Sequence, residues 1–322
     1  LGQFLQYVET FPSKTGRLCS LSILCASRET LVENGNLGDI VPYVPQVYRI
    51  MRDSDPDIVK KISYFLSYYI CAYEDEMASE RICRELISQG IFARLYELFN
   101  SDEEEKIAAL YLARAFATGL YGKFVPDLID AGLMSFIRSL LLSNCEKVQK
   151  EAMGVASGLV EMNCELCMQD KELLDCLERL TQIKPTGERY CLFLDIIAGL
   201  LSTKNCSNLK EVVERSFIDF VLDNANNRPT FGVKAGLTGV FHSLSEAFRI
   251  EEKRKPRGTK RNVLIQAVYD KGNFNPLIAV SKQPMIPVKQ DAYGNQPLHY
   301  KKLLCCIDSG NVQYLPATWW RN

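Results

Sequence analysis

Short polar breaks divide the chain into apolar segments with the periodicity of α-helices. The breaks are rich in Asp, Ser, Asn, Pro and Gly. They recur every 41 to 47 residues, at 12–16, 54–57, 101–102, 143–144, 184–187 and 227–230. Between them, apolar residues follow a period of about 3.6 positions, which indicates helices with one buried face. Two such faces are Val148, Ala152, Val155, Ala156 and Leu159, and Val233, Leu237, Val240, Phe241 and Leu244. Strand-like alternation is absent before about residue 262.

Each interval has the pattern of a helical hairpin. Gly90 and Gly132 lie 42 residues apart and are each followed by a short amphipathic segment, a polar break and a longer apolar helix. The longer helices are expected at Ile107–Thr118 and Val148–Val160. Glycine suits a left-handed bend between helices, and Asp, Ser or Asn in a break caps the next helix. Prolines are tolerated in the first helical turn, which we expect for Pro56, Pro185 and Pro229.

One hairpin cannot bury its own apolar face, so these units must stack. About six units of roughly 42 residues cover the chain from residue 1 to about residue 248. Stacking predicts an all-α protein that folds as one array. The alternative is a non-repetitive helical bundle.

The repeated residues resemble the armadillo repeat. The family pattern is close to Gly-apolar-x-x-Leu-x-x-Leu-x-Ser-x-x-x-x-Val-x-x-x-Ala-x-x-Ala-Leu-x-Asn-Leu. Segment Gly90–Phe116 follows it, and the outer units are equally HEAT-like. The fullest match has Gly132, Leu133, Phe136, Leu140, Ser143, Val148, Ala152, Val155, Ala156 and Leu159. The resemblance covers about three-quarters of the chain. It implies a right-handed α-solenoid of about six armadillo/HEAT-like repeats with a less regular C-terminal cap.

In armadillo proteins the third helix of each repeat lines a concave groove that holds an extended peptide or a partner helix. Alignment on the buried apolar positions implies the groove residues Tyr64, Tyr68, Tyr111, Ala115, Gly154, Gly158, Asp195, Gly199, Gly239 and Ser243. The Trp/Asn pairs with which importin α-type grooves hold basic peptides are absent at these positions. The resemblance therefore implies a partner-binding groove, but not importin-like capture.

The side chains at these positions permit two interpretations. Tyrosines give flat amphipathic contact surface at low entropic cost, and glycines let a partner backbone approach closely. Alternatively, the tyrosines are partly buried packing residues and the glycines relieve crowding between helices.

We expect three parts: a solenoid over 1–250, a basic exposed loop over 251–262, and a capping helix with an irregular tail over 263–322. The loop contains Lys253, Arg254, Lys255, Arg257, Lys260 and Arg261. A nuclear-localisation signal, a phosphate-contacting patch and a solvated loop are all compatible with it. The tail segment Asp291–Tyr300 resembles the ankyrin signature, but a single ankyrin unit cannot fold alone. Packing on the solenoid end is expected for Leu303, Leu304, Cys305, Cys306 and Trp319.

Composition narrows the function further. The 322 residues carry a formal net charge of −1, so no overall field attracts nucleic acid or an anionic membrane. The two histidines and the single CxxC, Cys164–Cys167, offer no metal-ligand set with the usual spacing. Phosphate-loop, dinucleotide, zinc-protease and serine-hydrolase motifs are absent. The twelve scattered cysteines favour free thiols in a reducing compartment, cytoplasmic or nuclear.

The sequence thus predicts a non-enzymatic interaction scaffold without cofactor or metal. We interpret the start at Leu1, without methionine or a signal-peptide pattern, as the boundary of a fragment of a larger intracellular protein. The expected partner is a protein or peptide in the groove. Homo-oligomerisation through a solenoid end is a further possibility, and no membrane partner is expected. The alternative is a nucleic-acid-associated helical module that uses the basic loop.

Overall fold

The computed structural model describes residues 2–33, 37–53, 55–71, 76–203, 205–224, 236–237, 239–240, 243–244 and 246–247. Every regular element among them is a helix, and none is a strand. The chain divides into two compact units, residues 1–163 (unit 1) and 164–322 (unit 2). The predicted all-α architecture is therefore confirmed for the described residues. The predicted basic loop at 251–262 and the predicted cap at 263–322 lie outside these residues.

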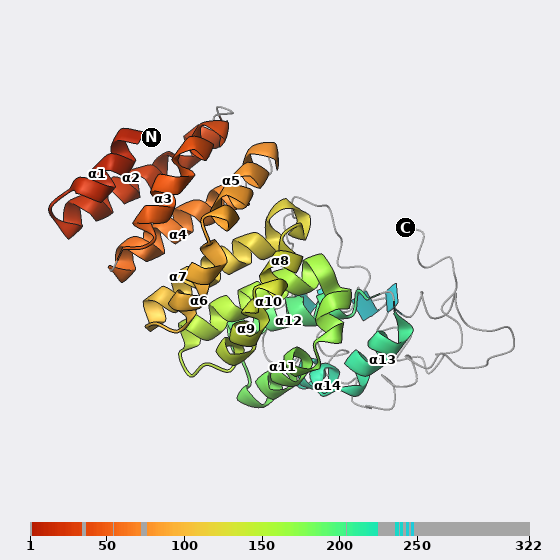
Figure 1. Ribbon diagram of the computed structural model, residues 1–322. Coiled ribbons are helices and arrows are strands. Elements are labelled where there is room, and N and C mark those ends of the chain that lie inside the picture. Colours follow the sequence, from red (N-terminus) through yellow and green to blue (C-terminus); the bar gives the residue numbers. More distant parts are fainter. Residues whose placement is uncertain are drawn as a thin grey trace, which may run out of the picture. The chain divides into compact units, whose positions relative to one another are not determined.

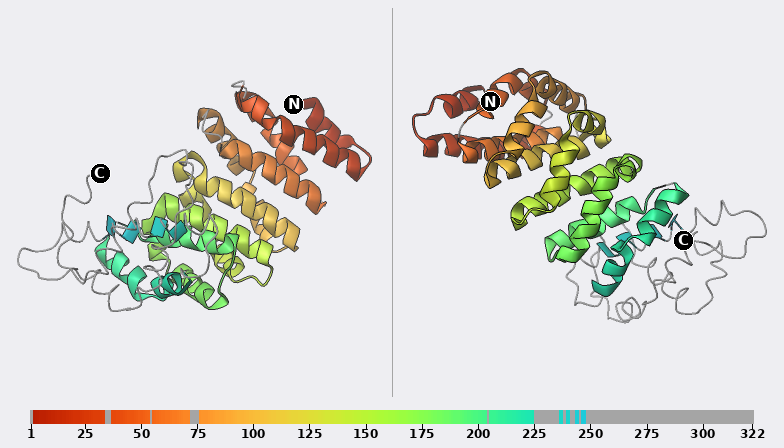
Figure 2. Two further views of the ribbon diagram at one scale, coloured as in Figure 1. Left: turned by 180° about the vertical axis from the view of Figure 1, so that it is seen from behind. Right: turned by 60° about the horizontal axis from the view of Figure 1, so that its bottom comes forward.

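Unit 1 is a stack of short and long helices (Figure 1). The long helices are α2 (Lys14–Glu33), α4 (Pro56–Ile70), α7 (Glu103–Thr118) and the first part of α10 (Glu146–Gln169). The shorter elements are α1 (Gly2–Thr10), η1 (Leu37–Tyr43), α3 (Val44–Ile50), α5 (Glu76–Ser88), α6 (Ile91–Phe99), η3 (Gly119–Gly122), α8 (Val125–Asp130) and α9 (Leu133–Leu141). Helix α4 packs between α2 and α7, and Figure 2 shows the same order from two other sides.

The polar breaks end and start helices as their chemistry predicts. Asp55 caps α4 by accepting a hydrogen bond from the backbone N–H of Asp57, and Pro56 is the first residue of that helix. Asp102 caps α7 through the N–H of Glu105. Gly90 and Gly132 have φ of 86° and 77°, the left-handed bends predicted before α6 and α9.

Pro185 is the exception. It lies between Ile183 and Glu188, in the link that precedes the next helix rather than in a first helical turn. The preceding helix ends at Ile183 and is capped by Lys184, which is left-handed with φ of 56°, and Gly187 is the N-cap of the next helix. The first-turn assignment of Pro185 was therefore wrong. Pro229 lies outside the described residues.

The predicted apolar faces form the core. Val148, Ala152, Val155, Ala156 and Leu159 of α10 are all buried. Burial of this continuous apolar stripe, at about 25 cal/mol per Å², is the main force that holds the stack together. The 3.6-residue period therefore located the packing face correctly.

Unit 2 contains the end of α10, α11 (Lys171–Ile183), α12 (Glu188–Leu200), α13 (Cys206–Glu214) and α14 (Phe217–Asn224). Helix α10 departs from helical geometry at Asn163, with φ of −148° and ψ of 66°, at the boundary between the units. The ring of Phe193 on α12 meets those of Phe217 and Phe220 at centroid distances of 6.3 and 5.3 Å. Further along the chain, the predicted core residues Leu237, Val240 and Leu244 are buried, whereas Val233 and Phe241 of the same predicted face lie outside the described residues.

Candidate functional site

The long helices α4, α7 and α10 of unit 1 lie in a fixed register. Lys60 of α4 forms an ion pair with Glu104 of α7. One to two turns further along, the rings of Tyr64 and Tyr111 meet edge to face with centroids 6.1 Å apart. We call the residues that these helices present beside one another the three-helix face, comprising Lys60, Lys61, Tyr64, Tyr68, Glu104, Tyr111, Arg114, Thr118 and Lys150.

Three tyrosines are the aromatic part of this face. Tyr64 is 44 % exposed, and Tyr68 and Tyr111 are half-buried. Burial raises the pKa of the Tyr111 hydroxyl, and the nearby carboxylate of Glu151 raises it further. The phenol therefore stays protonated at neutral pH, and Tyr111 presents a neutral O–H group beside its ring.

The small residues assigned to the groove lie beneath this face. Ala115 is 1 % exposed, and Gly154 and Gly158 are buried. A Cβ atom at Gly154 would lie 3.0 Å from Nη1 of Arg114, and one at Gly158 would lie 2.5 Å from Cγ2 of Thr118. These glycines let α7 and α10 approach closely. That geometry matches the interpretation in which glycine relieves crowding.

Arg114 is the residue of this face that sequence reasoning missed. It is exposed and lies one helical turn after Tyr111. The alignment paired positions four apart on each helix, such as Tyr111 with Ala115, whereas α7 exposes the residue three positions after the tyrosine. Residues three and four positions apart are both neighbours on a helix surface. Considering the third residue after Tyr111 as well as the fourth would therefore have found Arg114 in the sequence.

Two of the four cations of the three-helix face are paired with carboxylates. Glu104 neutralises Lys60 and raises the pKa of its ammonium group, while Lys150 lies 3.4 Å from the carboxylate of Glu151. Lys61 donates a hydrogen bond to the hydroxyl of Ser22 at 2.9 Å. Within the described part of the chain, neither Lys61 nor Arg114 forms an ion pair.

The remaining predicted groove residues belong to unit 2. Asp195 on α12 is exposed, and Gly199, Gly239 and Ser243 are half-buried. A Cβ at Gly239 would lie 3.6 Å from Cβ of Ala198, an ordinary contact, so this glycine is not needed for packing. Six of the ten predicted residues therefore belong to unit 1 and four to unit 2. The six basic residues between 253 and 261 lie outside the described residues.

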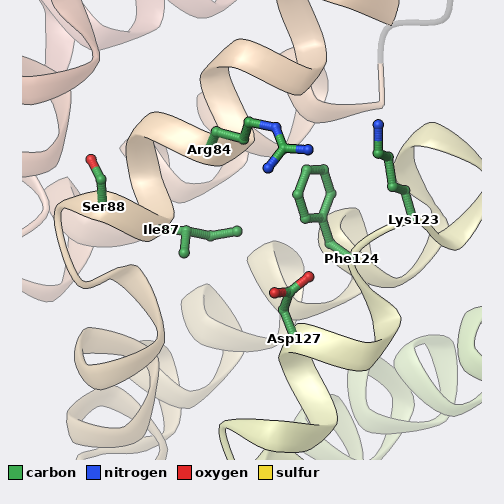
Figure 3. A pocket seen from close by; sticks show the side chains of 6 residues that line it. All are labelled: Arg84, Ile87, Ser88, Lys123, Phe124 and Asp127. Carbon is green, nitrogen blue, oxygen red and sulfur yellow. The ribbon is translucent and has the colours of Figure 1, made fainter.

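A small hollow opens between α5 and α8 of unit 1 (Figure 3). It has a volume of about 290 Å³ and is lined by Arg84, Ile87, Ser88, Lys123, Phe124 and Asp127. Glu80 beside it binds Arg84 at 2.7 Å and Lys123 at 2.6 Å, which lowers the pKa of its carboxyl group. The hydroxyl of Ser88 donates to the carbonyl of Glu85 rather than to a base. Among the residues that line the hollow, the structure thus places no nucleophile beside a base.

The cysteines of the CxxC motif are unsuited to thiolate chemistry at neutral pH. Burial raises the pKa of Cys164 to about 11 and that of Cys167 to about 12, with smaller contributions from nearby Glu165 and Cys164 respectively. Among the residues that the structure describes, no three His, Cys, Asp or Glu side chains gather as a metal site. In the same part of the chain, no helix has the length and apolar character needed to cross a membrane.

Comparisons with known proteins identify the architecture. No family model and no curated protein matches the chain. An engineered protein of known structure is 16 % identical over 83 % of this chain and 99 % of its own, with a TM-score of 0.62. A designed armadillo repeat protein in complex with the peptide (KR)4 is 20 % identical over 76 % of this chain and 98 % of its own, with a TM-score of 0.52. Uso1-1 is 14 % identical over 95 % of this chain and 50 % of its own, with a TM-score of 0.60. These likenesses show an all-α, armadillo-like solenoid fold.

Proposed function

We propose that this armadillo-like chain is a non-catalytic interaction scaffold that binds an extended peptide or a helix of a partner protein on its three-helix face. The observation that carries the proposal is the edge-to-face pair of Tyr64 and Tyr111, which brings an exposed and a half-buried aromatic ring from two successive repeats together. Tyrosine is enriched at binding hot spots because it buries a large area while losing little side-chain entropy.

The fold supports this proposal. Stacked repeats place equivalent helices side by side, so a partner can contact the same position in several repeats. A designed protein of the same fold was crystallised with a peptide, which fits a peptide-binding role for such a scaffold. For this chain, the partner and the binding mode are part of the proposal.

A selection from a library of random twelve-residue peptides tests the proposal. The enriched peptides are titrated against the wild-type chain and a Y64A/Y68A/Y111A variant. Truncating interface hot spots costs about 2 kcal/mol or more, so we expect the variant to bind at least about thirtyfold more weakly.

The chain offers a matched control in three other exposed tyrosines. Tyr7, Tyr96 and Tyr121 are 53 %, 53 % and 69 % exposed, and none belongs to the three-helix face. A Y7A/Y96A/Y121A variant removes the same atoms elsewhere and should bind as the wild type does. Circular dichroism of both variants checks that the helices remain folded. Equal loss of binding in both variants, or in neither, would reject the three-helix face as the site.

A further inference from the structure

We propose that Arg114 gives the three-helix face its specificity, by binding a carboxylate on an acidic side chain of the partner peptide. This inference rests on the function proposed above and adds the chemical class of the partner. It follows from the position of Arg114 and from the charges around it.

The first observation is the charge balance of the face. The carboxylates of Glu104 and Glu151 each have a lysine partner, Lys60 and Lys150. Arg114 has no such partner within the described part of the chain and is exposed. Lys61, with only a hydroxyl partner, adds a second uncompensated cation on the same face. The face therefore favours an anionic partner group over a cationic one.

The second observation is that the side chains around the Arg114 guanidinium are uncharged. Contacts between α4 and α7 join residues 44 to 47 positions apart, so Tyr68 lies across from the segment of α7 that contains Arg114. Tyr111 and Thr118 lie one turn away along α7 on either side. The neighbouring tyrosine and threonine side chains are uncharged, so they leave the charge of the exposed guanidinium uncompensated. A hydrogen bond from a charged donor to a carboxylate is stronger than one between neutral groups.

The third observation is the absence of a side chain at Gly154. Nη1 and Cδ of Arg114 lie 3.0 and 3.5 Å from the place where a Cβ atom at position 154 would stand. The arginine side chain thus lies across α10 in space that a larger residue would occupy. Holding the guanidinium against this surface reduces the entropy that it loses on binding, and its planar fork suits a carboxylate.

The same random peptide library tests this inference. We expect peptides selected on the wild-type chain to share Asp or Glu at one position, and peptides selected on an R114Q variant to lack that preference. In titrations, replacing the shared Glu by Gln should weaken binding to the wild type about tenfold or more, a typical effect for a hydrogen bond to a charged group. The same replacement should have little effect on binding to R114Q.

R114K and R114Q separate the effect of charge from that of hydrogen-bond geometry. Lysine keeps the positive charge but lacks the planar pair of guanidinium donors, and glutamine removes the charge. R114K should bind with intermediate affinity. Added salt should weaken wild-type binding more than R114Q binding, because it screens the exposed charge. Thermal unfolding of the three proteins checks that their folds are equally stable.

The outcomes distinguish the two proposals. Selected peptides that lose affinity in Y64A/Y68A/Y111A but carry Lys, Arg or no charge at a fixed position would overturn the acidic specificity and leave the proposed site standing. Equal losses on Glu-to-Gln replacement in wild type and R114Q would also overturn it. A library that yields no enriched peptide would contradict the proposed function, and this inference with it.

Discussion

On the three-helix face the tyrosines and Arg114 supply side chains, whereas the glycines beneath them leave space for neighbouring side chains. Tyr64 is exposed and Tyr68 and Tyr111 are half-buried, because the apolar period fixes which side of each helix is buried. That these tyrosines bind a partner stays a prediction. The alignment could not tell whether the fourth or the third following residue is exposed. The answer depends on the rotation of α7 against α10, which is set by packing: Ala115 is buried and Arg114 is exposed.

Buried thiols give the chain a pH dependence that can be measured. Burial raises the pKa of Cys83 well above its ordinary value and that of Cys167 to about 12. An unfolded thiol ionises near pH 8.5, so above that pH the unfolded state has released protons that the folded state retains. We expect the free energy of unfolding to be unaffected by these thiols below about pH 8. Each should lower it by about 1 kcal/mol between pH 8.5 and 9.5.

Urea denaturation at pH 7.5 and 9.5 measures this loss. A C83A/C167A variant should lose less stability over the interval than the wild type, whatever its stability at pH 7.5. Replacing the exposed Cys19 by serine should leave the loss of stability between pH 7.5 and 9.5 the same as in the wild type. An equal pH dependence in all three proteins would contradict the assignment to buried thiols.

Helix ends were largely predictable from the sequence, because caps depend on local chemistry. Asp55, Asp102, Gly90 and Gly132 all act as their residue types predict. The turn η3 was not predictable. Leu120 and Tyr121 adopt left-handed φ of 50° and 55°, which costs about 1–2 kcal/mol each. The backbone also packs closely at the start of this turn, where a Cβ at Gly119 would lie 2.8 Å from the carbonyl oxygen of Ile70.

The cap of α7 gives one prediction for a single element. The Asp102 carboxylate accepts a hydrogen bond from the N–H of Glu105 at 2.9 Å. We expect D102A to lower the free energy of unfolding by about 1 kcal/mol, because the first turn then loses its acceptor. D102S keeps an acceptor and should recover most of this loss in urea denaturation. Equal destabilisation by both variants would show that the cap is not responsible.

The close packing of α7 against α10 gives a second prediction about stability. A Cβ at Gly158 would lie 2.5 Å from the Cγ2 methyl group of Thr118, so G158A should destabilise the protein by about 1–3 kcal/mol through overpacking. T118S removes that methyl group and keeps the hydroxyl, which donates to the carbonyl of Arg114 at 3.0 Å. The double variant should therefore be less destabilised than the sum of the two single variants. Additive losses in this double-mutant cycle would contradict the proposed contact.

At the scale of the whole molecule, the repeat period near 42 residues was enough to predict the armadillo-like fold. A recurring apolar face can be buried only by stacking one unit on the next. The sequence analysis ended the long helix at Val160, whereas α10 departs from helical geometry at Asn163 and then continues to Gln169. The boundaries of the solenoid at residue 250 and of the basic loop at residue 262 stay predictions. The role of the basic segment from Lys253 to Arg261 stays a prediction too.

A crystal structure of the chain with its tightest-binding library peptide tests the central claim most directly. We expect the peptide to run across α4, α7 and α10, in contact with Tyr64 and Tyr111 and with a carboxylate within hydrogen-bonding distance of Arg114. A peptide seated elsewhere, such as in the hollow between Arg84 and Asp127, would contradict the account.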